Sequence, residues 1–391
     1  MIIGYPIYVK EVDKMQSAEA NRQIGKPMMR RSNLELLRII AMIMIVAHHF
    51  SVHGGFSFSA DSITVNRLWV QFIQIGGKIG VDIFVLISGY FLVSSQSLKT
   101  NKVIKLWLQI FTYSILLYLI FTAFGIISFD KFELIDNLLP ITFSRWWFAS
   151  TYFVLYLIYP YINKLLNKLD KKEYQRLLVL LTICWCIIPT LTKHTVQSNN
   201  LLWFIYLYSL AGYVRVFGVN TKSKWFSPIC ISLSVLIILL TFLSAVLFDE
   251  LGMKNEYFAK NATMFYGMQT LPILAISFLM FLGFLRLNIG YKRFINLIAS
   301  ATFGVYLIHD NAYMRSFLWT TVFANASHSE SKNLILYSLF VIFLVFAVCT
   351  VLELLRIYVF EKKYMGFVNA FADAIDKKKE KFFSLRIFDK L

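Results

Sequence analysis

The chain has little cysteine, little proline and few acidic residues. Its 391 residues include 4 Cys, 7 Pro and 22 Asp or Glu, and charged residues make up only 16%. A soluble domain carries about 25% charged residues, so this composition excludes an ordinary soluble protein. The four cysteines lie in apolar stretches without metal-ligand spacing, so we expect no disulfide framework and no metal site.

Long apolar runs dominate the chain instead. Hydrophobic residues make up 58% of it, and the mean hydropathy is +0.62. The runs extend over about 18–25 residues, enough to cross a bilayer as helices, and the short alternating segments of a membrane barrel are lacking. We therefore expect an all-α, polytopic membrane helical bundle of about ten transmembrane helices. The expected spans are 33–52, 70–95, 103–127, 146–164, 176–193, 201–218, 226–248, 262–286, 294–322 and 333–358.

The basic residues indicate how the chain is oriented. The net charge is +17, and Lys and Arg fall mainly in the two tails and in alternate loops. This distribution predicts cytoplasmic termini rather than nucleic-acid binding. We expect a cytoplasmic N-terminal tail without a signal peptide over 1–32, a membrane domain over 33–358 and a basic amphipathic cytoplasmic tail over 359–391. The last segment could lie on the anionic inner leaflet or dock a partner.

The first apolar run carries an unusual set of ionisable residues: Glu35, Arg38, His48 and His49. Such side chains cost at least a few kcal/mol each in hydrocarbon unless they are paired or face a polar cavity. Arg38 and His49 are eleven residues apart, which places them within about 20° on one helical face and about 16 Å apart along the axis. His48 points about 80° away from Arg38.

Two interpretations of this stripe remain open. A histidine is readily tuned as a general base near neutral pH, which favours His49 as a catalytic residue. Alternatively, His49 ends the helix facing lipid headgroups, and Glu35 with Arg38 forms a purely structural pair.

A second polar motif lies in the next run, within residues 76–92. Lys78 and Asp82 are four residues apart and could pair on one helix. The glycines of this segment permit close approach of another helix or of a ligand. Asp82 is the more unusual of the two charged residues, because it is a carboxylate inside an apolar run.

These motifs resemble those of the acyltransferase 3 family, integral-membrane enzymes that acylate sugars and cell-surface polymers. Its arginine and histidine, separated by ten residues, match Arg38 and His49, and its preceding acidic residue matches Glu35. Its Gly-Val-x-x-Phe-Phe-x-x-Ser-Gly motif, with one Phe replaced by Val85, matches Gly80, Val81, Phe84, Ser88 and Gly89.

Further segments extend the resemblance over about 33–358. The family's basic pair at the start of the third helix corresponds to Lys102 and Lys105, a replacement of arginine that loses bidentate phosphate geometry. The segment 145–163 resembles its Trp-containing span, with Trp147 as the functional Trp, and 303–310 resembles its closing helices.

The resemblance implies an acyl donor, commonly acetyl-CoA, that approaches from the cytoplasm and is not a permanently bound cofactor. Lys102 and Lys105 could hold its phosphates, with Trp147 nearby, although both lysines could be ordinary inner-face anchors. Arg38 could orient the donor or stabilise charge on the thioester oxygen, with Glu35 beside it. His49 could activate an acceptor hydroxyl or accept the acyl group itself.

The expected function is therefore that of a membrane O-acyltransferase. It would transfer an acyl group other than an aminoacyl group, most simply an acetyl group. The acceptor would be a sugar hydroxyl of a cell-surface polysaccharide, an exopolysaccharide or a lipid-linked precursor, at the plasma membrane of a bacterium. Asp82, Ser88 and His309 are candidates for lining the pocket. The alternative is a transporter or flippase for a glycan or an organic acid, in which Arg38, Asp82 and His49 line the path.

Overall fold

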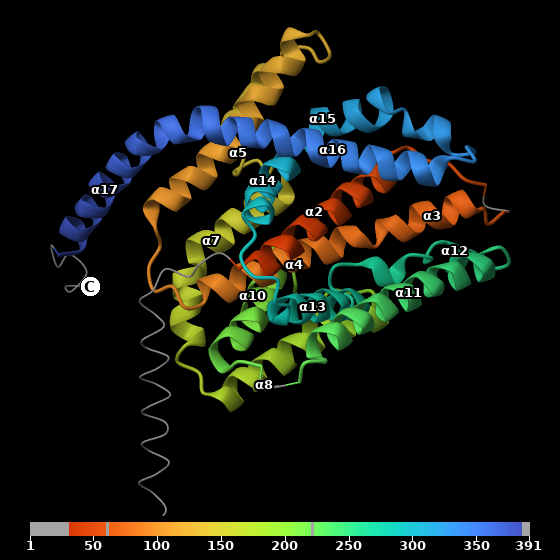
Figure 1. Ribbon diagram of the computed structural model, residues 1–391, viewed down its shortest axis with the longest axis horizontal. Coiled ribbons are helices and arrows are strands. Elements are labelled where there is room, and N and C mark those ends of the chain that lie inside the picture. The colour runs from red at the N-terminus through yellow and green to blue at the C-terminus, as the bar shows by residue number, and fades with distance from the viewer. Residues whose placement is uncertain (1–30, 60–61, 220–222, 385–391) are drawn as a thin grey trace, which may run out of the picture. The chain divides into compact units, whose positions relative to one another are not determined.

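The computed structural model describes residues 31–59, 62–219 and 223–384, with side chains as far as residue 379. From Ser32 onward the chain forms one compact unit. Its described residues form helices joined by loops, without a strand, which confirms the all-α class (Figure 1). Residues 1–30 of the expected N-terminal tail and residues 385–391 of the expected C-terminal tail lie outside the described part.

The helices follow one another with short connections. In chain order the longer ones are α2 (Ser32–His53), α3 (Val65–Gln74), α4 (Gly76–Leu92), α5 (Thr100–Ala123), α6 (Lys131–Leu138), α7 (Trp147–Leu166), α8 (Lys171–Thr182), α10 (Asn200–Phe217), α11 (Phe226–Gly252), α13 (Leu271–Arg286), α14 (Arg293–His309), α16 (Leu334–Arg356) and α17 (Lys362–Ser384). Shorter segments are η1 (Ile183–Ile187), α9 (Ile188–Thr192), α12 (Glu256–Ala259), η2 (Met264–Tyr266), α15 (Ala312–Ser316), η3 (Phe317–Val322), η4 (Asn325–His328) and η5 (Ile357–Glu361).

Seven segments of the described chain are long and apolar enough to cross a membrane. They are Ser32–His53, Val65–Leu92, Thr100–Ala123, Lys171–Thr192, Phe226–Gly252, Glu256–Arg286 and Leu334–Lys379. The other three expected spans, 146–164, 201–218 and 294–322, are occupied by α7, α10 and the region of α14, which are not among the seven.

The expected span over 294–322 is interrupted. α14 ends at His309, and the chain turns at Asp310 before α15 begins at Ala312. The side chain of Asn311 accepts hydrogen bonds from the backbone N–H groups of Tyr313 (3.1 Å) and Met314 (3.3 Å), an N-cap that starts a new helix. This break places Asp310 near His49, at the end of α2.

α2 lies inside the bundle and contacts α3, α4, α13, α14 and α16. Two glycines of α4 explain its close approach to α2. A Cβ atom at Gly77 would lie 2.2 Å from Cγ of His48, and one at Gly80 would lie 2.6 Å from the carbonyl oxygen of Ala41. Both glycines therefore allow the close packing of these two helices.

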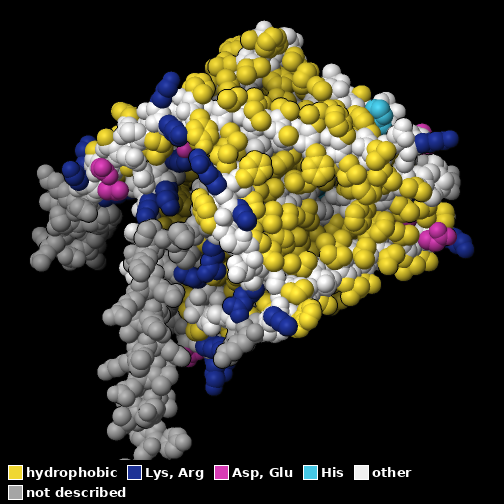
Figure 2. Space-filling view, viewed as in Figure 1, with side chains coloured by type: hydrophobic (Ala, Val, Ile, Leu, Met, Phe, Trp, Pro, Cys, Tyr) yellow, Lys and Arg dark blue, Asp and Glu magenta, His cyan; other side chains and the backbone are white. Residues whose placement is uncertain are grey.

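The outside of the bundle is apolar, as it must be in lipid. Along α11, leucines recur every three or four residues and are all exposed, which forms one outward face. Figure 2 shows a broad hydrophobic surface, with Lys and Arg side chains gathered toward one end of it. The exposed leucines of this face are Leu233, Leu236, Leu240, Leu243 and Leu247.

A group of ionisable side chains, most of them buried, joins α5 to the end of α16. Glu353 accepts hydrogen bonds from Arg356 (two, each 2.8 Å) and from the Tyr113 hydroxyl (2.6 Å). Arg356 also donates to Glu361 (2.8 Å), which forms an ion pair with Lys105. We call these five residues the charged network, and every charge in it has a partner of opposite sign.

The C-terminal helix packs against the start of α5. The Thr100 hydroxyl donates to a carboxylate oxygen of Asp376 at 2.5 Å, and Asn101 bonds Asn369 at 3.1 Å. Part of the expected basic tail is thus a helix docked on the membrane domain.

Candidate functional site

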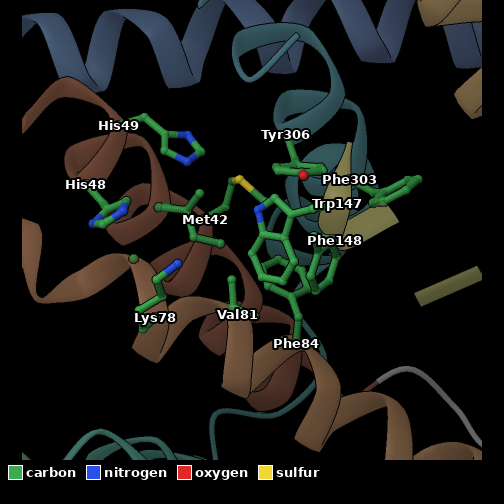
Figure 3. A pocket seen from close by; sticks show the side chains of 12 residues that line it. Met42, His48, His49, Lys78, Val81, Phe84, Trp147, Phe148, Phe303 and Tyr306 are labelled. Carbon is green, nitrogen blue, oxygen red and sulfur yellow. The ribbon is translucent and has the colours of Figure 1, made fainter. Parts of the chain in front are cut away.

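A small cavity opens among four helices that are distant in sequence. α2, α4, α7 and α14 contribute its walls, which are mostly aromatic or aliphatic, and its volume is about 40 Å³ (Figure 3). We call it the histidine cavity. It is lined by Met42, Ile45, His48, His49, Gly77, Lys78, Val81, Phe84, Trp147, Phe148, Phe303 and Tyr306.

His49 is held by a directional chain of hydrogen bonds. Nδ1 of His309 lies 2.6 Å from the carbonyl oxygen of Val305, and Nε2 of His309 lies 2.9 Å from Nδ1 of His49. A carbonyl oxygen only accepts, so Nδ1 of His309 carries the proton. Nε2 of a neutral His309 must then accept, and Nδ1 of His49 must donate. This assignment leaves the lone pair of a neutral His49 on Nε2.

Asp310 supports the same imidazole from the end of α14. One of its carboxylate oxygens lies 3.6 Å from Nδ1 of His49 and 3.4 Å from a guanidinium nitrogen of Arg315. The carboxylate is buried. A nearby negative charge stabilises the imidazolium that forms when His49 takes up a proton, so the arrangement suits a general base.

His48 also lines the histidine cavity, but it is bound differently. Its Nδ1 lies 2.7 Å from the carbonyl oxygen of Gln74, the last residue of α3. Because that carbonyl precedes the junction with α4, His48 fixes α2 to this junction. His49, rather than His48, is the member of the pair whose ring is oriented by other side chains.

Lys78 and Trp147 complete the polar features of the histidine cavity. The Lys78 ammonium lies over the Trp147 ring, 5.3 Å from its centroid. The ion pair considered between Lys78 and Asp82 does not form. Instead, Asp82 is fully buried and accepts a hydrogen bond from the indole N–H of Trp203 at 3.0 Å.

Glu35 and Arg38, the residues predicted toward the inner face of the membrane, lie away from the histidine cavity. One nitrogen of Arg38 donates to both carboxylate oxygens of Glu35, at 3.0 and 3.1 Å. The Glu35–Arg38 pair considered from the sequence therefore forms. Neither residue lines the histidine cavity.

The three candidate pocket residues are likewise placed elsewhere. Asp82 bonds Trp203, as described above. Ser88 donates to the carbonyl oxygen of Phe84 (2.8 Å) and bonds the Tyr152 hydroxyl (3.1 Å). His309 supports His49 from behind rather than lining the histidine cavity.

The candidate donor-binding residues are split between two places. Trp147 lines the histidine cavity, whereas Lys102 and Lys105 lie on the first turns of α5. Lys105 belongs to the charged network through Glu361, and Lys102 is exposed. The helical spacing of the two lysines was visible in the sequence, but the pairing of one of them with a distant glutamate was not.

One group of the described residues has the composition of a metal site. Ligand atoms of His49, His53 and Asp310 lie within 4.8 Å of one another. Two of these groups already have hydrogen-bond or ion-pair partners, because His49 bonds His309 and Asp310 faces Arg315.

The sequence analysis did not predict that Asp310 lies beside His49 or that Lys78 lies over Trp147. Asp310 follows a candidate pocket histidine directly, and a carboxylate beside a histidine in an apolar run is the signal that could have marked it. Lys78 was considered only as a partner of Asp82. Its contact with Trp147, which is distant in sequence, could not be read from a local pattern.

Comparison with known proteins identifies the family of the chain. The family model described as an acyltransferase domain, acyltransferase 3, matches residues 31–354. Neither the search of curated proteins nor that of solved structures found a match. The matched region contains both α2 and the His309–Asp310 turn. The chain belongs to the acyltransferase 3 family, and this membership implies a membrane acyltransferase.

Proposed function

We propose that this protein is a membrane O-acyltransferase that moves an acetyl group from acetyl-CoA to a sugar hydroxyl of a cell-surface or exopolysaccharide. The observation that carries the proposal is the hydrogen-bond chain from Val305 through His309 to His49, which leaves a basic nitrogen on a residue that lines the histidine cavity. Family membership supports the reaction class.

In the proposed reaction, Nε2 of His49 removes the proton of the acceptor hydroxyl while its oxygen attacks the thioester carbonyl. A C–O bond forms, and the carbonyl π electrons move to the oxygen. When the C=O bond re-forms, the C–S bond breaks and the CoA sulfur takes the proton from Nε2. The imidazole is then neutral again, and no covalent acyl-enzyme is needed.

The two substrates would reach His49 from opposite sides. The distribution of basic residues supports cytoplasmic termini, so α2 would start at the inner face. Arg38 would lie about 16 Å inward of His49 and face the donor. The exposed Lys102 suits a phosphate contact at the inner surface, whereas Lys105 is engaged by Glu361. The acceptor would enter from the outer side of a bacterial plasma membrane.

The test is a comparison of His49→Gln with His194→Gln, which changes an exposed histidine outside the site. Native cells that carry each variant are assayed for alkali-released acetate from surface polysaccharide, and purified proteins for label transfer from [14C]acetyl-CoA. We expect His49→Gln to lose about 10²- to 10⁴-fold in transfer at normal protein level, and His194→Gln to behave as wild type.

Normal transfer by His49→Gln would overturn the catalytic assignment. Absence of any transfer by the wild type, together with flux of a glycan or organic acid in proteoliposomes, would overturn the enzyme proposal in favour of a transporter.

A further inference from the structure

The histidine cavity is lined by an ammonium group that forms no direct ion pair with a carboxylate of the described residues. Lys78 lines it together with His49, and Figure 3 shows the Lys78 amine directed toward the interior and Trp147. In the described part of the chain, no carboxylate lies within ion-pairing distance of Lys78. Asp82 and Asp310 attract Lys78 only from beyond ion-pair distance. Asp82 accepts a hydrogen bond from Trp203, and Asp310 faces Arg315 and His49.

This arrangement differs from that of other cations within the bundle. Arg38 pairs with Glu35, Arg67 with Asp249, and Arg356 with Glu353. A cation in an apolar interior costs several kcal/mol unless it is paired, and the face of one Trp ring offsets only part of that cost. An ammonium without a direct ion pair at the reaction site is therefore free to interact with negative charge that develops on a substrate.

The proposed acyl transfer generates such an anion. Attack on the thioester carbonyl places a full negative charge on its oxygen, and a fixed cation beside that oxygen lowers the barrier most in a dry site. Arg38, the residue first considered for this role, is bound to Glu35 and does not line the histidine cavity. Lys78 does line it, as does the base His49.

We propose that Lys78 stabilises the oxyanion of the tetrahedral intermediate. This inference rests on the proposed function. The carbonyl π electrons move to the oxygen beside the Lys78 ammonium as the C–O bond to the acceptor forms, and they return when the C–S bond breaks. Lys78 keeps its protons throughout, while His49 carries the transferred proton. The cation–π contact with Trp147 holds the ammonium in place until the charge appears.

The test uses the full-length protein in detergent micelles with [14C]acetyl-CoA and native polysaccharide, and compares Lys78→Met, Lys78→Arg and the control Lys254→Met. Lys254 is an exposed residue outside the site. We expect Lys78→Met to lose about 10²- to 10³-fold in kcat, with the KM for acetyl-CoA nearly unchanged. Lys78→Arg retains the charge and should recover most of this loss.

A second measurement separates catalysis from a structural role. Lys78→Met removes a half-buried charge that forms no direct ion pair, so its thermal unfolding midpoint should equal or exceed that of wild type. A lower midpoint would show that Lys78 holds the fold through Trp147 and would overturn the inference.

Two kinetic outcomes would overturn it as well. One is a kcat of Lys78→Met within about threefold of wild type. The other is recovery of the wild-type rate at saturating polysaccharide, which would make Lys78 a binding residue for an anionic acceptor. A wild-type protein without transfer activity would instead refute the proposed function and remove the basis of this inference.

Discussion

Two groups of buried ionisable residues occur in the same bundle, and they differ in how well they are satisfied. In the charged network, Arg356 bonds both Glu353 and Glu361, and Glu361 also binds Lys105. In the histidine cavity, Lys78 has a Trp ring for a partner, and the lone pair of His49 is left on Nε2. The charges of the charged network are all paired within it, whereas the polar groups of the histidine cavity are only partly paired.

The difference separates a structural from a chemical use of charge in a membrane. A fully paired network costs least to bury and holds helices together, here α5 to the end of α16. A group of partly paired polar side chains retains a free-energy cost of burial that a ligand or a reaction intermediate can relieve. Such groups are typical of functional sites. We therefore assign a stabilising role to the charged network and a reactive role to the histidine cavity. Substitutions can test each assignment.

The largest effect on stability is expected from Arg356→Met. It leaves Glu353 and Glu361 buried without their shared cation, and breaking a buried pair in this way costs about 3–5 kcal/mol. The unfolding midpoint and the yield of monodisperse protein measure it, with the exposed Arg176→Met as control. An unchanged midpoint for Arg356→Met would contradict this assignment, because the charged network would then not stabilise the fold.

A smaller, purely kinetic effect is expected from His309. His309→Leu removes the acceptor for Nδ1–H of His49, and loss of such an orienting partner costs about 10- to 100-fold. The loss should appear in kcat rather than in KM, and His309→Gln, which retains an acceptor, should recover part of it. Equal rates for His309→Leu and wild type would show that His49 needs no orientation.

The smallest effect is expected from metal removal. His49, His53 and Asp310 could in principle ligate an ion, but the proposed reaction uses His49 as a base bonded to His309. Dialysis of the purified protein against a chelator should leave acetyl transfer unchanged. Loss of activity that zinc restores would contradict the base mechanism and would move His49 into a metal site.

Local sequence patterns predicted those features that depend on neighbours along the chain. Apolar run length predicted the helical class, and helical spacing predicted that Glu35 and Arg38 could pair, as they do. The cost of burying charge marked His49 as unusual. Each of these follows from the period of an α-helix and from the apolar solvent.

Features made by distant segments could not be read in this way. His309 reaches His49 across 260 positions of sequence, and Glu361 reaches Lys105 across 256. A helical period contains no information on which helices become neighbours. The sequence suggested Lys105 as a phosphate ligand or an inner-face anchor and Lys78 as a partner of Asp82. It could not show that Lys105 pairs with Glu361 or that Asp82 bonds Trp203.

The most direct measurement of the central claim is acetyl transfer per folded molecule, for His49→Gln and Glu353→Gln side by side. Transfer from [14C]acetyl-CoA is divided by the amount of monodisperse protein, and unfolding midpoints are recorded on the same samples. The account predicts that His49→Gln is stable and inactive, whereas Glu353→Gln is less stable but active in its folded fraction. An active His49→Gln, or a stable Glu353→Gln that has lost transfer, would contradict it.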